Sequence, residues 1–404
     1  MNKLELLAPA GDFSKLKTAL YYGADAVYVG GKAFSLRALA GNFDNDELKQ
    51  ATGYTHKLGK KIYVTANILA RNYDFEALKG YFEFLNDLKV DGVIISDVGV
   101  LNYAKKYAPD VPLHVSTQMN VLNAETVRFW RDFGVKRVIL ARELSLEEIA
   151  YIHRSIPDVE LEAFVHGAMC ISYSGRCLLS NYFTGRDSNR GACVQACRWE
   201  YEIREKNKKG EFYPIEEDDK GTYILNSKDL NLLYYLDELE KSGVVSLKIE
   251  GRMKSEYYIA TVINAYRRAL DAYYVKGEEC KTDKSFMTEV CKTVHRDFTT
   301  AYALGNNEET VNYDDSQSKG THMFIANVTD YKDGYAVIEQ RNRFKVGDTL
   351  EVLSPTDNHN KQIEVKRLDD ENGNEVSDAK LVQQKLRLYT DVKLQSGDIL
   401  RKKL

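Results

Sequence analysis

Residues 61–96 of the chain read KIYVTANILARNYDFEALKGYFEFLNDLKVDGVIIS. Within them, Lys61–Thr65 is a short β-branched run, Phe75–Lys89 has the periodicity of an amphipathic helix, and Gly92–Ser96 is a second β-branched run. A strand, a helix and another strand in this order form a βαβ unit, whose two strands lie parallel. The same alternation extends over about the first 280 residues and predicts an α/β fold.

The repeats of this unit predict a closed barrel. Strand-like runs are Glu5–Ala8, Ala26–Val29, Lys61–Thr65, Gly92–Ser96, Leu113–Ser116, Arg137–Leu140, Glu160–Val165 and Ser246–Ile249. Helical patterns between them include Asp12–Tyr22, Phe75–Lys89, Ser145–Ser155 and Ser255–Val275. Eight such units in about 280 residues are typical of a (β/α)8 TIM-type barrel. A doubly wound open sheet is the alternative, but the turn APAGD after the first run is not a GxGxxG fingerprint.

The seventh unit carries a long insertion. After Glu160–Val165, 63 residues precede the next predicted helix, Asp229–Lys241, and they contain four of the six cysteines of the chain. A loop of this length inside a compact domain is usually functional. Because it follows a strand, we expect it at the C-terminal face of the barrel, where such barrels place their active sites.

The C-terminal part follows a different pattern. From about Thr321, short alternating segments such as MFIANVTDY, YAVIEQ and DTLEVL replace the long helices. This pattern predicts a small antiparallel β-barrel. The predicted domains are a barrel over residues 1–280 with a Cys-rich insertion at 168–222, a helical linker over 281–320, and a small β-barrel domain over 321–404.

Composition restricts the class of protein. Among 404 residues, 44% are hydrophobic and 29% are charged, as in ordinary globular proteins. No secretory signal and no run of 18 apolar residues is present, so we expect a cytoplasmic protein that does not span a membrane. The net charge is −4, but between Cys170 and Gly210 eight Arg or Lys oppose four Asp or Glu, a local +4. This basic segment suits an anionic partner, although a solvated loop would have the same pattern.

Polar residues at the ends of the predicted strands form a candidate site. They are Asp12, Ser35, Arg37, Thr65, Asn67, Asp97, Ser116, Gln118, Asn120, Arg142, Glu143, Glu162, His166, Lys248, Glu250 and Arg252. In a barrel these residues converge, and at least four of them are cations, which suits a small carboxylate or phosphate. We expect about half of the set to pair with one another and to support the barrel.

The cysteine cluster indicates a metal centre. Its spacing is Cys170-x6-Cys177-x15-Cys193-x3-Cys197, and in a reduced compartment clustered thiols bind metal more often than they form disulfides. Structural zinc knuckles usually have two close pairs, whereas four irregularly spaced thiolates also suit an iron–sulfur cluster, so the spacing leaves both open. A nucleophilic Cys/His pair with His166 is a weaker alternative, and His166 could equally be a buried structural histidine.

The sequence resembles a known family. The run Glu162–Ser180, EAFVHGAMCISYSGRCLLS, resembles the signature of the collagenase-like peptidase family U-thirty-two. Further similarity lies in ELLAPAG at residues 5–11, in Ser116–Asn120, in LNSKD at 225–229 and in KIEGRMK at 248–254. The resemblance extends over nearly the whole chain, and the terminal β-domain is similar to second-domain barrels of translation factors.

This resemblance implies two alternative activities. Some members are described as collagenases that hydrolyse peptide bonds, and others are oxygen-independent hydroxylation factors for RNA bases or a quinone precursor. The cysteine spacing together with CRWEY at 197–201 is most similar to the branch that installs the 5-hydroxyl of wobble uridine in tRNA with prephenate. No GxSxG or HExxH protease motif is visible, which favours hydroxylation. A scaffold subunit that acts with a paralogue, or a homo-oligomer, is also compatible with the sequence.

The resemblance and the strand-end residues together give a set of expected roles. A [4Fe–4S] cluster is expected on Cys170, Cys177, Cys193 and Cys197, with zinc as the alternative metal. Expected catalytic residues are His166, Glu162, Arg252 and Lys248. Expected substrate-binding residues are Arg37, Asn67, Gln118, Asn120, Arg142, Arg186 and Arg198. The expected partners are the tRNA anticodon region and the dicarboxylate prephenate.

Overall fold

The structure, a computed structural model, describes residues 3–35, 41–169, 183–184, 186, 194, 217–218, 221–222, 227–305 and 319–404. Its chain divides into two compact units. Unit 1 comprises the described parts of Met1–Leu16, Asp25–Met253 and Arg296–Ser318. Unit 2 comprises Lys17–Ala24, Lys254–His295 and Lys319–Leu404. The domain boundaries expected from the sequence stay a prediction.

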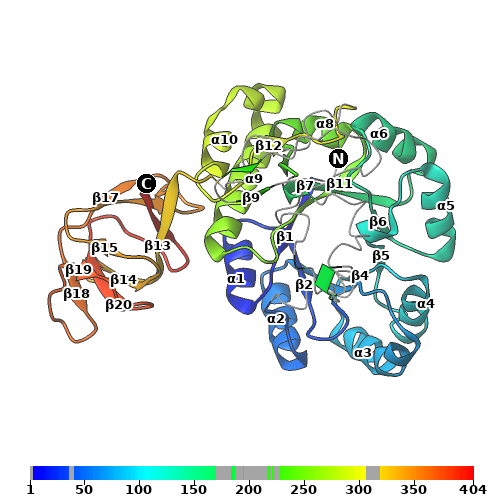
Figure 1. Cartoon of the computed structure of the whole chain (residues 1–404), viewed down its shortest axis with the longest axis horizontal. Coiled ribbons are helices and arrows are strands. Elements are labelled where there is room, and N and C mark those ends of the chain that lie inside the picture. Colours follow the sequence, from blue (N-terminus) through cyan, green and yellow to red (C-terminus); the bar gives the residue numbers. More distant parts are fainter. Residues whose placement is uncertain are drawn as a thin grey trace, which may run out of the picture. The chain divides into compact units, whose positions relative to one another are not determined.

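Unit 1 contains a closed barrel of parallel strands (Figure 1). Its strands are β1 (Glu5–Pro9), β2 (Ala26–Gly30), β3 (Lys61–Ala66), β4 (Gly92–Ile95), β5 (Leu113–Val115), β6 (Arg137–Ile139), β7 (Glu160–Ala168) and β11 (Val244–Ile249). Neighbours in the chain are neighbours in the sheet, and β11 closes the ring by pairing in parallel with both β7 and β1. The predicted TIM-type barrel is therefore confirmed, and each predicted strand has its counterpart.

Helices alternate with these strands. They are α1 (Phe13–Tyr21), α2 (Asn45–Lys57), α3 (Phe75–Leu88), α4 (Val98–Tyr107), α5 (Ala124–Phe133), α6 (Leu146–Ser155) and α8 (Leu236–Lys241). The short 3-10 turns are η1 (Asn72–Asp74), η2 (Thr117–Met119) and η6 (Leu233–Tyr235). Helices α2 to α6 lie outside the ring of strands in Figure 1. Local sequence fixes where α6 begins. Ser145 Oγ accepts a hydrogen bond from the Glu148 amide at 3.3 Å, and Glu148 Oε2 accepts one from the Ser145 amide at 2.8 Å.

Apolar faces attach these helices to the barrel. In α3, Leu78, Phe82 and Leu85 recur at helical spacing, and all three are fully buried. Each such side chain contributes about 1.5–3 kcal/mol of transfer free energy. The charged residues Lys79 and Glu83 of the same helix are exposed and pair only at 3.8 Å. The sequence pattern that predicts this helix is thus also the pattern that anchors it.

One predicted helix is shorter than expected. The sequence predicts a helix over Asp229–Lys241, but Asp229–Asn231 forms the strand β10, and only Leu236–Lys241 is α-helical. Strand β10 pairs antiparallel with the end of β7 and parallel with β12 (Phe298–Thr299). Arg296 Nη2 also holds the Asp229 carboxylate at 2.7 Å. Tertiary pairing therefore outweighs the local helical pattern here.

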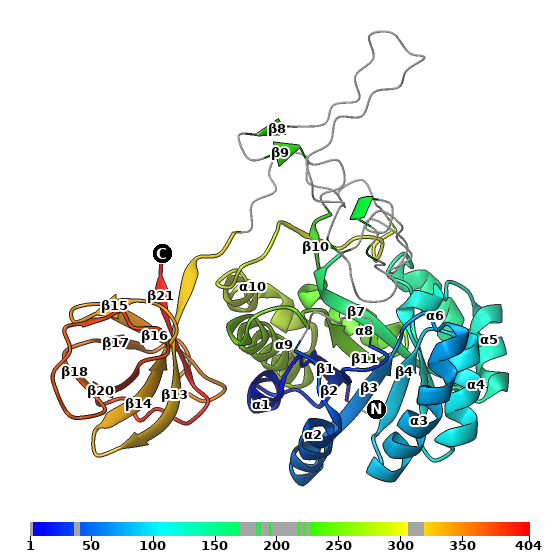
Figure 2. The same ribbon diagram turned by 60° about the horizontal axis from the view of Figure 1, so that its bottom comes forward.

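Unit 2 contains helices and the C-terminal sheet. The helical segments are α9 (Glu256–Lys276), η7 (Gly277–Thr282) and α10 (Ser285–Val290). The strands are β13 (His322–Lys332), β14 (Tyr335–Gln340), β15 (Phe344–Lys345), β16 (Thr349–Leu353), β17 (Gln362–Glu364), β18 (Leu368–Asp370), β19 (Asp378–Ala379), β20 (Lys385–Tyr389) and β21 (Ile399–Lys403). Seven of them form one antiparallel sheet in the order β17-β16-β21-β13-β14-β20-β18, and β15 pairs with β19. The sheet curves around an apolar core that includes Ile325, Ile338 and Leu388 (Figure 2).

The predicted antiparallel β-domain is confirmed as a half-barrel. Within residues 319–404, the edge strands β17 and β18 are not paired with each other. Two further short strands, β8 (Glu217–Asp218) and β9 (Gly221–Thr222), form a separate antiparallel pair.

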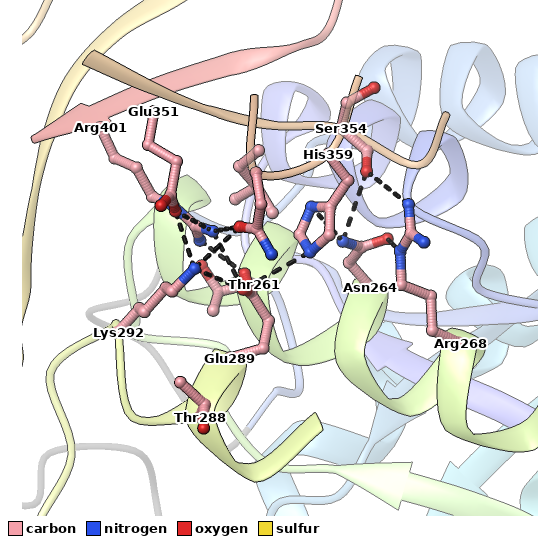
Figure 3. A network of polar contacts seen from close by, with 12 residues as sticks. Thr261, Asn264, Arg268, Thr288, Glu289, Lys292, Glu351, Ser354, His359 and Arg401 are labelled. Atoms are coloured by element: carbon pink, nitrogen blue, oxygen red, sulfur yellow. Dashed lines mark hydrogen bonds and ion pairs between the residues drawn. The ribbon is translucent and has the colours of Figure 1, made fainter. Parts of the chain in front are cut away.

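A buried ionic network joins α10 to the sheet inside unit 2 (Figure 3). Arg401, which is fully buried, binds Glu289 at 2.9 Å and Glu351 at 2.8 Å. Lys292 lies 2.7 Å from Glu351, and His359 lies 3.5 Å from Glu289. Burial opposes ionisation of Glu289, but His359 and Arg401 hold the pKa of its carboxyl well below the ordinary value. Each buried charge is thus compensated, which burial requires.

Candidate active site

The barrel interior contains a compact ionic layer. The Lys248 ammonium lies 2.7 Å from Glu162 Oε1, and Arg137 Nη1 lies 3.0 Å from Glu162 Oε2. The same Arg137 nitrogen lies 2.7 Å from Glu5 Oε1, which also accepts from Ser246 Oγ at 3.0 Å. Glu162 is 0% exposed and Lys248 is 4% exposed. Two carboxylates therefore meet two cations within the packed core.

Charge and burial set the protonation states of this layer. Burial raises the pKa of the Glu162 carboxyl, but the charges of Lys248 and Arg137 outweigh burial and hold that pKa below its ordinary value. Burial lowers the pKa of His114 well below its ordinary value, and the charges of Arg137 and Lys248 add to this effect. Glu162 is therefore ionised and His114 is neutral near neutral pH.

The position of this layer bears on two expected catalytic residues. Glu162 and Lys248 lie within β7 and β11, below the loops at the C-terminal ends of the strands. The Lys248 ammonium packs 4.4 Å from the Tyr28 ring centroid. Their contacts are those of residues that hold the barrel together. Arg137 was not expected in the site, although an inward-facing Arg at the start of the strand Arg137–Ile139 signals a buried partner.

At the C-terminal face, Arg252 organises a cluster of neutral polar groups. Its guanidinium donates to Thr65 Oγ1 at 3.0 Å, to Ser35 Oγ at 2.8 Å and to Asn42 Oδ1 at 2.9 Å. All four side chains are buried. A Cβ atom at Gly30 would lie 2.8 Å from the guanidinium, so the close approach of Arg252 requires glycine there. Asn42 is a member of the cluster that the strand-end pattern did not identify.

A second polar chain connects the ends of β3, β4 and β5. Asn67 Nδ2 donates to Gln118 Oε1 at 2.7 Å, and Ser96 Oγ donates to the Asn67 carbonyl at 2.8 Å. Thr117 Oγ1 extends the chain to β6 by donating to the Leu140 carbonyl at 2.9 Å. The expected site residues Asn67 and Gln118 are thus brought together at the mouth of the barrel.

Two expected ligand-binding residues carry unsatisfied donors. Arg142 Nη1 donates to the Ala168 carbonyl at 2.9 Å, and its guanidinium lies 5.6 Å from the Phe164 ring centroid. Arg142 Nε is buried without a hydrogen-bond partner among the described residues. No Asp or Glu among these residues forms an ion pair with Arg142. Asn120 Nδ2 is likewise buried without a partner in the described part of the chain. The loops of both residues are joined by the bond from the Ala141 amide to the Val121 carbonyl at 3.2 Å.

His166 is buried at the end of β7. It faces Asn231 of β10 in the antiparallel register, and its carbonyl accepts from the Glu250 amide at 2.8 Å. Its ring lies 5.5 Å from that of Phe298. Two acids of the strand-end set have structural roles at helix starts: Asp12 accepts from the Lys15 amide at 2.9 Å, and Asp97 accepts from the Val100 amide at 3.0 Å. The expectation that part of the set supports the barrel agrees with these contacts.

Several expected site residues lie outside the described residues: Cys170, Cys177, Cys193, Cys197, Arg37 and Arg198. Arg186 is described and exposed, and its amide donates to Thr184 Oγ1 at 3.3 Å. Among the described residues, no group of three His, Cys, Asp or Glu side chains is placed to hold a metal ion. Described strand β7 ends at Ala168, two residues before Cys170 in the chain.

The two remaining cysteines are described, and neither is in a disulfide. Cys280 is buried, and burial raises the pKa of the Cys291 thiol. A raised thiol pKa reduces reactivity. In the described ranges of the chain, no helix has the length and apolar character to cross a membrane.

Comparison with known proteins identifies the family. The profile of Peptidase family U32 matches residues 11–313, and that of the Peptidase family U32 C-terminal domain matches residues 320–401. The chain is 40% identical to tRNA hydroxylation protein P1 of Bacillus subtilis, over 99% of this chain and 95% of that protein. It is 37% identical to tRNA hydroxylation protein P of Escherichia coli, over 90% of this chain and 89% of that protein. It is 36% identical to the 23S rRNA 5-hydroxycytidine C2501 synthase of Escherichia coli, over 73% of this chain and 44% of that protein. The chain therefore belongs to Peptidase family U32.

Proposed function

We propose that this protein is an enzyme that hydroxylates RNA, and that its substrate is the wobble uridine of tRNA. Relatives that match nearly the full chain are named for tRNA hydroxylation, and a more distant relative is named for hydroxylation of a ribosomal cytidine. The finer proposal is an oxygen-independent 5-hydroxylation that depends on prephenate and on a [4Fe–4S] cluster. A cytoplasmic protein is proposed because tRNA is the substrate.

The observation that carries this proposal is the state of Arg142. Its guanidinium is half-buried, its Nε is buried without a partner, and no carboxylate among the described residues pairs with it, so its charge is available to an anion. Asn120 adds a second unpartnered donor on the adjoining loop. A dicarboxylate such as prephenate would supply acceptors to both residues. Arg142 would then bind and orient the co-substrate at the mouth of the barrel.

The same arginine adjoins the start of the cysteine-rich segment. Arg142 Nη1 binds the carbonyl of Ala168, and Cys170 follows two residues later in the chain. Cys170, Cys177, Cys193 and Cys197 would hold the cluster, since four thiolates are the usual ligand set of such centres. When bound, a cluster supplies or accepts single electrons. The polar groups at the mouth of the barrel, His166 and Arg252 among them, would position the uridine ring and exclude water.

The charge of the sequence supports an RNA partner. The segment between Cys170 and Gly210 has a local charge of +4, although the whole chain has −4. Arg186 within it is exposed, which suits contact with a phosphate of the anticodon region. Arg37 and Arg198 are proposed to assist, and a homo-oligomer or a paralogous partner subunit could complete the interface.

The test is a direct assay of the anaerobically purified protein. Incubation with tRNA and prephenate should yield hydroxyuridine, which nucleoside mass spectrometry detects. Parallel incubation with gelatin tests the peptidase activity for which the family is named. Hydroxylation without cleavage supports the proposal, and cleavage without hydroxylation overturns it.

A further inference from the structure

The outer face of the C-terminal sheet carries an aromatic patch that the proposed chemistry does not use. Strands β14, β20 and β18 lie side by side in this sheet (Figure 2). Along them, alternate residues such as Ala336, Leu368 and Leu388 are buried in the apolar core. The residues between these belong to the opposite face and are partly or largely exposed. Four of them form the aromatic patch: Tyr335, Arg367, Arg387 and Tyr389.

The planar groups of the aromatic patch lie next to one another. Tyr335 is opposite Tyr389 in the strand pair, with ring centroids 5.5 Å apart and an interplanar angle of 50°. The Arg387 guanidinium carbon lies 5.6 Å from the Tyr335 centroid, and that of Arg367 lies 4.5 Å from the Tyr389 centroid. Two planar cations therefore flank a pair of aromatic rings on one sheet face.

Hydrogen bonds divide the aromatic patch into a closed half and an open half. The Tyr389 hydroxyl donates to Asp369 Oδ2 at 2.8 Å, and Arg367 donates to both oxygens of that carboxylate at 2.9 and 2.8 Å. These three groups satisfy one another. Arg387 Nη2 instead donates to the Glu371 carbonyl at 2.9 Å, and within residues 319–404 no carboxylate forms an ion pair with Arg387. Arg387 is thus the cation of the patch that is open to a partner.

The charge left on this face is positive. The two acids that alternate with the patch residues are already paired: Asp369 with Arg367 at 2.8 Å, and Glu339 with Arg341 at 3.0 Å. Lys385 approaches Glu371 only at 3.9 Å, and both of these side chains are more than half exposed, so solvent screens the pair. Arg387 and Lys385 on β20 therefore favour an anionic partner.

The chemistry of the aromatic patch suits an unpaired nucleotide. Proteins hold such nucleotides by stacking the base on an aromatic ring or a guanidinium plane, and by pairing cations with the phosphates. A hydrophobic protein partner fits less well, because Val337 is the one aliphatic residue of the outward-facing set on the described strands β14, β18 and β20. Duplex RNA keeps its bases stacked on one another and leaves none free for the rings.

We propose that the aromatic patch binds an unpaired nucleotide of the RNA substrate. The base stacks on the Tyr335 ring, and Arg387 pairs with an adjoining phosphate. This inference rests on the proposed function, because it takes RNA as the substrate. Neither residue contacts the reacting atoms, and both hold the RNA on the protein.

Binding of a labelled single-stranded oligouridylate of about ten nucleotides to the full protein tests the inference. Tyr335→Leu should weaken binding by about fivefold to 150-fold, the effect of losing one stacked base. Tyr335→Phe keeps the ring and should bind as the unchanged protein does. Tyr151→Leu removes a tyrosine of α6 that is 61% exposed and lies outside the patch, so it should also bind normally. An RNA duplex of the same length should be insensitive to Tyr335→Leu.

Salt dependence separates stacking from charge. Arg387→Met should lower the slope of log affinity against log salt by about 0.7, the value for one phosphate contact on a single strand. Tyr335→Leu should leave that slope unchanged, because stacking releases no counterion. Ultraviolet crosslinking of the complex, followed by peptide mass spectrometry, should place an adduct on the segment that contains Tyr335. A purely structural role of the patch predicts neither result.

The outcomes also separate the patch from the proposed reaction. Tyr335→Leu should melt within about 5 °C of the unchanged protein, because cross-strand aromatic pairs contribute little to stability. Normal oligouridylate binding by Tyr335→Leu, or an equal loss in Tyr335→Phe, overturns the inference. If the unchanged protein hydroxylates tRNA while Tyr335→Leu binds normally, only the patch is rejected. If the patch binds the oligouridylate but no hydroxyuridine forms, only the proposed reaction is rejected.

Discussion

Lys248 Nζ lies 2.7 Å from Glu162 Oε1 in the interior of the barrel, where neither side chain is more than 4% exposed. Arg137 Nη1 lies 3.0 Å from Glu162 Oε2, the other oxygen of the same carboxylate. One carboxylate thus neutralises charge from two strands, β6 and β11. This relationship makes Glu162 the residue on which the ionic layer depends, and it gives that residue a strong structural role.

Glu162→Gln should therefore destabilise the fold. The substitution leaves Lys248 and Arg137 with less compensation in a buried site, and breaking a buried ion pair costs about 3–5 kcal/mol. Denaturant unfolding of the variant and the unchanged protein measures the difference in their free energies of unfolding. Glu125→Gln on α5 is the control, because Glu125 is 79% exposed and pairs with Arg128 at the surface, so its loss should cost about 1 kcal/mol or less. A Glu162→Gln variant of full stability and no activity would contradict the structural role and assign Glu162 to catalysis.

The stability of the barrel should fall on acidification because of His114. Its folded-state pKa is depressed, so the unfolded state binds the proton more strongly, and stability rises with pH. The loss should begin as pH falls below about 6.5, the pKa of an unfolded histidine. His114→Gln should flatten the slope by up to about 1.4 kcal/mol per pH unit near pH 5.5. An unchanged slope in His114→Gln would show that His114 is not its source.

Gly30→Ala should disturb the mouth without unfolding the barrel. The added Cβ would lie 2.5 Å from Ser35 Oγ and 2.8 Å from the Arg252 guanidinium, so these side chains must move. We expect at least about a tenfold loss of kcat/KM, because a displacement of about 1 Å in a positioned group can cost more than that. Gly80→Ala on α3 is the control, since its Cβ would meet nothing within 4 Å. It should raise stability by about 0.5–1 kcal/mol and keep full activity. Equal activity of the two variants would contradict the role of Arg252.

Removal of single thiols tests the metal centre. Anaerobically purified protein should be brown and contain about four irons per chain. Ser substitutions of Cys170, Cys177, Cys193 or Cys197 should each reduce the iron content, and Cys197→Ser is the first to make. Cys291→Ser should retain the metal, since this thiol belongs to unit 2 and lies outside the cysteine-rich segment. A colourless protein with one zinc would reject the cluster.

Sequence periodicity was sufficient for the barrel, because each strand and helix carries its own local signal. Leu78, Phe82 and Leu85 mark the buried face of α3 in the sequence as clearly as in the structure. Local signals were insufficient at Asp229–Asn231, where pairing with β7 and an ion pair to Arg296 produce a strand instead of a helix.

For the site, sequence indicated which polar residues follow the strands but not how they pair. The strand-end rule placed Asn67 with Gln118 and Arg252 with Thr65 correctly at one face. It did not distinguish Glu162 and Lys248, which point into the barrel interior, from residues at the mouth. Asn42 was missed because it reaches the site from a loop, and only the tertiary structure brings it there.

The central claim is that Arg142 binds an anionic co-substrate for tRNA hydroxylation, and nucleoside mass spectrometry of tRNA from a deletion strain tests it most directly. Hydroxyuridine should disappear on deletion and return when the unchanged gene or Arg128→Met, a surface control on α5, is supplied. Arg142→Met should fail to restore it, because the apolar side chain fills the space without binding an anion. Undiminished hydroxyuridine in the deletion strain would contradict the proposed function, and full restoration by Arg142→Met would contradict the role of Arg142.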